Sequence, residues 1–482
     1  MFLGIDLGTS GVRVLLVDAD GQPVASADSA TTVSRPQHGW SEQDPRQWVE
    51  ALDAAIEQLR LKAPGFADLK GIGVAGHMHG ATLLDSTNSV IRPCILWNDT
   101  RSHAEATVLD RTEGIRAKSG NIVFPGFTAP KLEWVRTHEP DDYARVAKVL
   151  LPAAYLNFHL TGEHVADMSD SAGTSWLDVG KRAWSPELLS AGHMREDQMP
   201  RLVEGSRVAG VLRPELAAKW GVSPGVVVAG GAGDNAAAAC GTGALNEGMG
   251  FVSLGTSGVV LAARNGFHPD PESAVHTFCL AVPDRWYQMG VMLSATDCLN
   301  WLSTITGQKP SALTALLGDK VQPPSRTRFL PYLSGERTPH NDAAIRGSFT
   351  GLGTGTSVAD MTQAVIEGVT FSLRDSAEAL RGTGAQLDQM LCIGGGSASR
   401  YWVRLLATVL NTPLQLPVSG EFGAALGAAR LGLCAATGAD PDAVMTPPEI
   451  GEVIQPDTSL TAAFDDAYAA FRASYPKIKD IQ

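Results

Sequence analysis

The hexapeptide Leu7-Gly8-Thr9-Ser10-Gly11-Val12 occurs a second time in this chain, as Leu254-Gly255-Thr256-Ser257-Gly258-Val259. The second copy begins 247 residues (254 − 7) after the first, which is close to half of the 482-residue length. Each copy lies between apolar, strand-like segments, and this context predicts a β-turn-β hairpin in each half. A repeat at this spacing indicates duplicated domains. We therefore expect an α/β protein with two similar domains, residues 1–245 and 246–482.

The two predicted turns are candidate phosphate sites. Glycine, threonine and serine in a tight turn present backbone amides and hydroxyls to phosphate oxygens without obstruction. Two such turns facing each other could clamp a polyphosphate, and a bulky side chain at Gly8 or Gly255 would both block it and strain the turn. No GxxxxGK[ST] string occurs, so a P-loop is excluded. The candidate residues are Gly8, Thr9, Ser10, Gly255, Thr256 and Ser257.

A second glycine-rich stretch, Gly231-Ala232-Gly233-Asp234-Asn235, follows the apolar strand Val226–Ala229 and precedes an alanine-rich run. Asp234 thus lies where a strand leads into a helix. It has two interpretations: a helix cap, a common role for aspartate, or a catalytic base at the mouth of a cleft. The stretch alone does not decide between them.

Composition limits the class of protein. Hydrophobic residues make up 44% and charged residues 18%, which is typical of a globular protein with large cores. The net charge of −13 argues against nucleic-acid or membrane-surface partners, since both usually require a basic face. The six cysteines are scattered without a CxxC pair, so neither a zinc site nor a disulfide framework is indicated. With no signal peptide and no long apolar run, we expect a cytoplasmic protein.

Polar groups in the first half suggest a small-molecule site. Gly71–Gly76 matches GxGxxG, but the glycines themselves read as a strand, so a dinucleotide site is not favoured. After this strand, His77 and His79 would share a face in extended chain and could bind a metal. Because no third ligand is in view, contacts with a substrate are the favoured interpretation. Trp97-Asn98-Asp99 suits sugar recognition, although a solvated loop with a packed tryptophan would explain it equally well.

Further elements follow from periodicity and small residues. Helices are predicted from Pro45, with Asp44 as its cap, and over Val358–Leu380. The strand Gln389–Ile393 leads into Gly394-Gly395-Gly396-Ser397, where an adenine or ribose could lie flat on the backbone; a tight turn alone would also explain the glycines. Gly423–Ala429 predicts a helix that packs closely.

Together these residues resemble the FGGY family of carbohydrate kinases, within the actin, hexokinase and Hsp70 fold group. The resemblance covers essentially the whole chain. Asp6–Ser10 is similar to the first phosphate motif, Leu254–Gly258 to the second and Ile393–Ser397 to the adenosine motif. Further strings are most similar to family members that act on D-xylulose: Met78-His79-Gly80, Trp97-Asn98-Asp99, Gly233-Asp234-Asn235 and Ser334–His340.

The resemblance implies a fold and a site. The fold is two duplicated actin/hexokinase/Hsp70-like (ribonuclease H-like) domains around a central cleft, with sugar in the N-terminal domain and nucleotide in the C-terminal one. Asp234 would be the general base, and Asp6 would hold Mg²⁺, mostly through water. Other implied residues are Met78, His79, Trp97, Asp234 and Asn235 for the sugar, and Gly395, Gly396 and Ser397 for the adenosine.

The implied activity is ATP-dependent phosphorylation of D-xylulose to D-xylulose 5-phosphate by direct in-line transfer. The alternatives are another sugar or polyol (ribulose, a deoxy sugar or glycerol) and, outside the class, an actin- or Hsp70-like ATPase. The sequence departs from the family pattern at His77, where glutamine is usual beside the sugar site, and at Ala153-Ala154, where Lys-Asp is common. The oligomeric state is left open, with a homodimer among the options.

Overall fold

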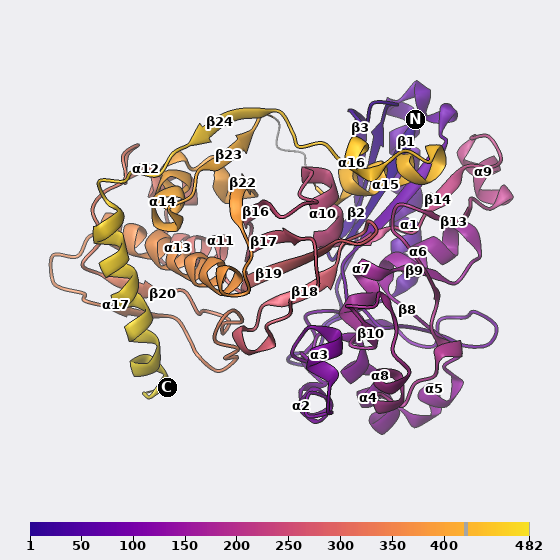
Figure 1. Ribbon diagram of the computed structural model, residues 1–482, viewed down its shortest axis with the longest axis horizontal. Coiled ribbons are helices and arrows are strands. Elements are labelled where there is room, and N and C mark those ends of the chain that lie inside the picture. The colour runs from indigo at the N-terminus through magenta and orange to yellow at the C-terminus, as the bar shows by residue number, and fades with distance from the viewer. Residues whose placement is uncertain (419–422, 482) are drawn as a thin grey trace.

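The computed structural model describes residues 1–418 and 423–481, which form two units, each built on a seven-stranded mixed sheet (Figure 1). The first sheet has the order β13-β14-β5-β1-β2-β3, with β15 also paired to β5. The second has the order β18-β19-β17-β16-β22-β23-β24. The strands of the first sheet are β1 (Phe2–Gly8), β2 (Gly11–Val17), β3 (Pro23–Ala30), β5 (Gly71–Gly76), β13 (Val208–Val211), β14 (Val227–Ala229) and β15 (Ala232–Gly233). Those of the second are β16 (Gly248–Leu254), β17 (Gly258–Arg264), β18 (His276–Cys279), β19 (Trp286–Met292), β22 (Leu387–Ile393), β23 (Leu414–Pro417) and β24 (Ile450–Ile454).

The two sheets repeat one pattern of strand pairing. In the first, β1 pairs antiparallel with β2 and parallel with β5, while β2 pairs antiparallel with β3. In the second, β16 pairs antiparallel with β17 and parallel with β22, while β17 pairs antiparallel with β19. The pattern continues outward, since β14 is parallel to β5 as β23 is to β22. The predicted duplication, with a repeated hexapeptide in each hairpin, is therefore confirmed.

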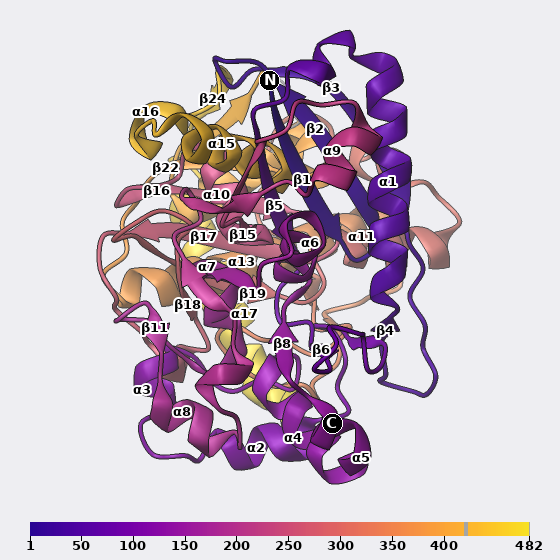
Figure 2. The same ribbon diagram turned by 90° about the vertical axis from the view of Figure 1, so that its right-hand side faces the viewer.

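Helices cover these sheets where the sequence predicts them. Helix α1 (Pro45–Lys62) lies along β2 and β3 (Figure 2), with Asp44 accepting a hydrogen bond from Arg46 N at 3.0 Å. In the second unit α13 (Val358–Gly382) buries one face against β19 and β17, and Ser357 caps it. The other long helices are α14 (Arg400–Leu410) and α17 (Thr461–Lys479).

Two helices of small residues lie between the sheets: α10 (Asp234–Thr242) and α15 (Ala424–Thr437) (Figure 1). Helix α15 comes from the second half of the chain but packs on β1 and β5 of the first sheet. A Cβ added at Gly73 would lie 1.9 Å from Ala428 O, and one at Gly427 would lie 1.8 Å from Ala237 O. The close packing predicted for Gly423–Ala429 is thus observed. The domain boundary between residues 245 and 246 stays a prediction. Helix α15 lies after this boundary in the sequence but packs on the sheet of the first unit.

A smaller region between β5 and β13 extends the first unit below its sheet. Its helices are α2 (His103–Leu109), α3 (Ile115–Ser119), α4 (Thr128–His138), α5 (Pro140–Arg145), α6 (Pro152–Thr161), α7 (Met168–Ser171) and α8 (Pro186–Ala191). This region also contacts the second sheet, because Asn121 Nδ2 donates to Thr277 O at 3.0 Å and Asn121 Oδ1 accepts from Thr277 N at 3.2 Å. Within the described residues, no helix combines the length and apolar character needed to cross a bilayer.

Candidate active site

Asp234 is the first residue of α10, directly after β15. The helix is capped by Gly233, whose amide donates to Ser169 Oγ at 3.1 Å. The carboxylate of Asp234 does not bond the amides of the next turn; its Oδ1 accepts from Asn235 N at 2.6 Å and from Asn235 Nδ2 at 2.9 Å. The side chain stays partly accessible, and burial raises its pKa to about 6. A carboxylate held in this way can accept a proton near neutral pH.

Asp6 lies near Asp234 because their strands flank the same neighbour. Asp6 in β1 is in register with Ala75 of β5, and Gly233 of β15 is in register with Gly76. Burial, and then the carboxylate of Asp234, raise the pKa of Asp6 to about 7, while Arg13 opposes the shift. The carboxylate of Asp234 thus acts on Asp6 across β5, near the carboxyl ends of the two strands that flank it.

The turn of the first hairpin is tied to the polar loop at Trp97. Trp97 Nε1 donates to Thr9 Oγ1 at 3.0 Å, and Gln43 Nε2 donates to Thr9 O at 2.7 Å. Neither Gly8 nor Gly255 has a positive φ angle. The expectation that a side chain at these glycines would strain the turn is therefore wrong, and such a side chain would act only through the space that it fills.

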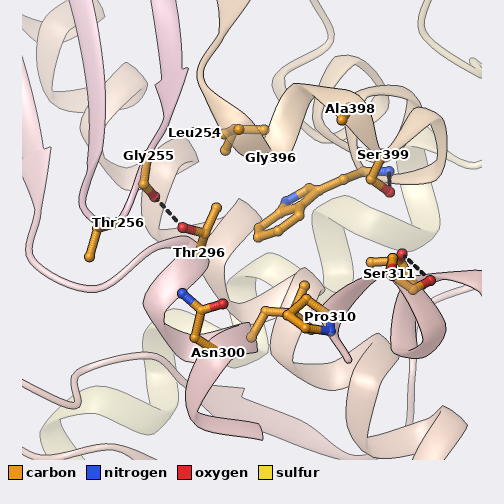
Figure 3. Close-up of a pocket in the computed structure, with 14 residues that line it drawn as sticks. Leu254, Gly255, Thr256, Thr296, Asn300, Pro310, Ser311, Gly396, Ala398 and Ser399 are labelled. Carbon is orange, nitrogen blue, oxygen red and sulfur yellow. Dashed lines mark hydrogen bonds between the residues drawn. The ribbon is translucent and has the colours of Figure 1, made fainter. Parts of the chain in front are cut away.

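The second hairpin turn borders a cavity of about 530 Å³ (Figure 3). Thr296 Oγ1, at the start of α11 (Thr296–Thr306), donates to Gly255 O at 2.8 Å and fixes the turn at the cavity edge. A Cβ at Gly396 would come within 2.8 Å of Leu254 Cβ, so a side chain there would narrow the cavity. The residues that line it are Leu254, Gly255, Thr256, Thr296, Leu299, Asn300, Pro310, Ser311, Thr314, Gly395, Gly396, Ala398, Ser399 and Trp402.

This cavity brings together four of the nucleotide candidates and adds residues that the sequence did not single out. Gly255, Thr256 and the pair Gly395 and Gly396 line it as expected together, while Ser397 is not among its lining residues. Asn300 and Thr314 come from α11 and α12 (Pro310–Ala315), neither of which carries a motif. Only Asn300 has a sequence signal: it lies four residues after Thr296, so the two side chains share one face of α11.

Met78 and His79 occupy the strand end beside Asp234. Met78 packs against Gly233, and its Sδ lies 3.8 Å from Tyr287 Oη. His79 has φ 71° and stacks on Phe127 with ring centroids 4.4 Å apart. Its Nδ1 bonds Gly173 O at 2.7 Å, so this nitrogen carries the proton and Nε2 remains an acceptor. Burial lowers the pKa of His79 to about 3, which keeps the ring neutral.

Two side chains of α4 hold the backbone of His79. The carbonyl of His79 accepts from Thr128 Oγ1 at 3.1 Å and from Lys131 Nζ at 2.9 Å. Lys131 is fully buried, and burial lowers its pKa to about 7. These bonds stabilise the left-handed conformation of His79, which is uncommon for a residue with a side chain.

His77 does not share a face with His79, contrary to expectation, because the left-handed backbone at His79 breaks the two-residue alternation. His77 is buried edge-on to Trp48 at 5.6 Å, and neither of its ring nitrogens has a partner. His77, the first position at which the sequence departs from the family pattern, is thus buried in the core at the end of β5. The second departure, Ala153 and Ala154, is also buried, at the start of α6. Among the described residues, no three histidine, cysteine or carboxylate side chains are grouped to hold a metal.

Several polar groups near this strand end carry no sequence motif. Both oxygens of Asp170 are buried without a partner, and burial, then Asp167 and Asp234, raise its pKa well above the usual range. Tyr287 lies close to the same carboxylates. From the second unit, His276 and Arg337 approach His79. Arg337 lies within Ser334–His340, a string similar to one in the family, but the sequence did not indicate a role for this residue.

Comparison with known proteins decides the family. The model of the FGGY family of carbohydrate kinases, N-terminal domain, matches residues 1–241, and the C-terminal domain model matches residues 250–436. The chain belongs to the FGGY family of carbohydrate kinases. It is therefore an ATP-dependent sugar kinase, and the alternative of an actin- or Hsp70-like ATPase is not supported.

Relatives extend over the full length of this FGGY kinase. It is 46% identical over 481 residues to a xylulose kinase of Escherichia coli (strain K12), covering 99% of each chain, and 45% identical to one of Klebsiella pneumoniae, covering 100% of each. A crystal structure described as a xyloylose kinase from Brucella ovis is 56% identical, with a TM-score of 0.98 and full coverage of both chains. The xylulose kinase structure from Rhodospirillum rubrum is 29% identical with a TM-score of 0.91, covering 100% of this chain and 99% of that one. These matches confirm the predicted fold class.

Proposed function

We propose that this FGGY kinase phosphorylates D-xylulose at its terminal hydroxyl to give D-xylulose 5-phosphate. The observation that carries the proposal is the coupled pair Asp6 and Asp234 on the two strands that flank β5, beside Met78 and His79. The similarity to xylulose kinases over 99% of the chain supports this sugar ahead of ribulose, a deoxy sugar or glycerol.

Asp234 is the proposed general base. Its carboxylate is ionised above pH 6 and partly accessible, so it can accept the proton of the attacking hydroxyl. Asn235, whose amide and side chain both donate to Asp234 Oδ1, orients the carboxylate. Catalysis of phosphoryl transfer rests mainly on positioning and charge stabilisation, so we expect in-line displacement without a covalent intermediate.

The sugar would lie against the first unit. His79 Nε2 is free to accept a hydrogen bond from a sugar hydroxyl, and the Phe127 ring beneath it holds the imidazole in place. Met78 supplies an apolar wall, and Trp97 closes the side nearest the first hairpin turn. This arrangement combines one apolar surface with a few fixed polar groups, as is usual for small-molecule sites.

The nucleotide would lie between the hairpin turns and the cavity of the second unit. Gly8, Thr9 and Ser10, with Gly255, Thr256 and Ser257, would contact the phosphates. Gly395, Gly396 and Ser397 would contact the adenosine; the cavity of about 530 Å³ beside the first two supports this placement.

A magnesium site at Asp6 fits the residues present. Mg²⁺ keeps much of its water shell and usually takes one or two carboxylates together with substrate phosphates, so it does not need a cluster of three protein ligands. When bound, it would neutralise charge on the phosphates. Asp6 would hold it mainly through water, and the charge would also favour ionisation of the two coupled aspartates.

Sugar-dependent release of ADP tests the proposal. The protein is assayed with ATP·Mg²⁺ and each of D-xylulose, D-ribulose, 1-deoxy-D-xylulose and glycerol, and ³¹P NMR locates the phosphate on the product. We expect the highest kcat/KM with D-xylulose and phosphate at C5. Preference for another acceptor would contradict the substrate. Retention of configuration with chiral γ-phosphate would contradict in-line transfer. A homodimer stays a prediction, which sedimentation can check.

A further inference from the structure

Arg337 is presented by a firmly anchored loop of the second unit, between β20 (Arg328–Leu330) and β21 (Ser348–Thr350). On one side, Glu336 is buried and accepts hydrogen bonds from Leu293 N at 3.2 Å and Ser372 Oγ at 2.9 Å. On the other side, Thr338 Oγ1 accepts from Val291 N at 3.0 Å. Because both neighbours are fixed, the direction of the Arg337 side chain is set by the fold.

The guanidinium of Arg337 lacks a counter-ion. Its Cζ lies 4.7 Å from the centroid of the Phe124 ring, which belongs to the first unit, and its Nη1 lies 3.4 Å from His276 Nε2. Across residues 1–418 and 423–481 no carboxylate forms an ion pair with it, although the charge of its chain neighbour Glu336 acts to raise its pKa. A guanidinium has five N–H donors and cannot lose its charge at neutral pH. Most of these donors are therefore available to a ligand.

Hydrogen-bond geometry shows that His276 is a neutral acceptor toward Arg337. Asn121 Nδ2 donates to Ser119 O at 2.7 Å and to Thr277 O, so Asn121 Oδ1 must be the acceptor facing His276 Nδ1 at 3.0 Å. His276 Nδ1 thus carries the proton, and Nε2 accepts from Arg337. Burial and then the Arg337 charge lower the pKa of His276 well below its usual range. The arginine is oriented without being neutralised.

Arg337 is connected to His79 through packed aromatic rings. A continuous group of rings joins the two histidines: His276 is 5.9 Å from Phe127, which stacks on His79 at 4.4 Å. The positive charge of Arg337 contributes to the lowered pKa of His79, whereas the pKa of Asp234 responds to burial and to Asn235. Through these rings the guanidinium is connected to the His79 side of the proposed sugar site.

We propose that Arg337 binds the end of the sugar remote from the hydroxyl that is phosphorylated, and that it selects oxygens that only accept hydrogen bonds. The inference rests on the proposed function of Asp234 and His79. A guanidinium can only donate, and its fork suits two neighbouring oxygens. The matching ligands are the C1–C2 end of a 2-ketose, with its carbonyl oxygen, and the carboxylate of an aldonate. His79 Nε2 complements it by accepting from a hydroxyl.

The test compares Arg337→Gln and Arg337→Lys with a control, Arg328→Gln, which changes an exposed arginine of β20. D-xylulose is the substrate, and D-xylonate is the charged probe, added as a competitor. We expect Arg337→Gln to raise the KM for D-xylulose roughly 10- to 100-fold, as for loss of hydrogen bonds to a charged donor, with little change in the KM for ATP. In Arg337→Gln, inhibition by D-xylonate should weaken by a larger factor than binding of D-xylulose. Arg337→Lys should recover part of this inhibition. The control should match the wild type.

Three results would overturn the inference: an unchanged KM for D-xylulose in Arg337→Gln, a loss confined to kcat or to the KM for ATP, or a wild-type enzyme that D-xylonate does not inhibit competitively. The wild-type rate with D-xylulose tests the proposed function by itself, so failure of either idea is distinguishable. Circular dichroism checks folding of each variant. If Arg337→Gln does not fold, Arg337→Lys, which keeps a charge over Phe124, carries the same KM and inhibition tests.

Discussion

Trp97 Nε1 donates a hydrogen bond to Thr9 Oγ1 at 3.0 Å, so a residue proposed for the sugar site is bonded directly to a turn proposed for the phosphates. The indole is 40% exposed, which leaves its ring available to a substrate. Occupancy of one subsite can therefore affect the geometry of the other through a single bond.

Trp97→Phe tests this link. Loss of one neutral hydrogen bond, worth about 1 kcal/mol, should raise the KM for ATP roughly fivefold. The KM for D-xylulose should change as well if the indole also contacts the sugar. Steady-state kinetics with each substrate varied in turn provides the measurement. Trp184→Phe is the matched control, because Trp184 Nε1 bonds Pro200 O at 2.9 Å away from these residues. Wild-type KM values in both variants would argue against the link.

Asp234 should impose an acid limb on the pH profile. Its pKa of about 6 means that the base is ionised above this pH and protonated below it. We expect kcat/KM to be level above about pH 6.5 and to fall about tenfold per pH unit below pH 6. Asp234→Asn should lower kcat about a hundredfold or more and remove this limb. A variant with near-normal kcat would exclude Asp234 as the base.

The same shift predicts that Asp234 destabilises the fold at neutral pH. Its pKa is raised in the folded state, so the folded protein is penalised once the pH exceeds the unfolded value near 3.8, and the penalty is complete above about pH 6. Asp234→Asn should therefore have a higher Tm than the wild type at pH 7.5 and an equal Tm near pH 4. Thermal melts across this range decide the matter, and a Tm difference that is independent of pH would refute the interpretation.

Asp6→Asn should weaken the response to magnesium more than the binding of sugar. A group that holds a metal through water typically affects affinity by 10- to 100-fold, so we expect the half-saturating Mg²⁺ concentration to rise about tenfold. Titration of Mg²⁺ at fixed ATP provides the measurement, with the KM for D-xylulose as internal control. An unchanged Mg²⁺ dependence together with normal kcat would remove Asp6 from the metal site.

Close packing of α15 on the first sheet should make Gly73 intolerant of substitution. In Gly73→Ala the new Cβ would lie 1.9 Å from Ala428 O, so the helix must move. Overpacking of this kind costs about 1–3 kcal/mol or more. Chemical denaturation measures the loss. Gly353→Ala, whose Cβ meets nothing within 4 Å, is the control and should be neutral. Equal stabilities of the two variants would show that α15 adjusts freely.

The duplicated architecture could be predicted because its signal is local. The same six residues connect two antiparallel strands in both halves, although the first turn closes with Gly8 opposite Gly11 and the second with Leu254 opposite Gly258. The partner of α15 could not be predicted, since Gly427 reveals only that something approaches closely. Its contacts on β1 and β5 come from residues more than 300 positions earlier.

Some features of the candidate site could likewise be predicted from the sequence, and others could not. Asp234 was singled out by its place where a strand leads into a helix, and Asp6 by its resemblance to a family motif; their closeness follows from strands that share the neighbour β5. The prediction that His77 and His79 share a face was wrong because it assumed an extended chain. The left-handed backbone of His79 breaks the two-residue alternation. Asn300 carries no motif, because its place depends on how a helix faces a cavity. Arg337 lies in the family-like string Ser334–His340, but the direction of its side chain depends on how that loop is anchored.

The position of α15 also bears on synthesis of the protein. The first sheet is complete in sequence by Gly233, yet one of its faces is covered by residues 424–437. As the chain emerges from the ribosome, that face has no native cover until residues 424–437 have been made. Exposed apolar strand surface in such an intermediate favours aggregation. The amino-terminal sheet therefore completes its native packing only after α15 has been made.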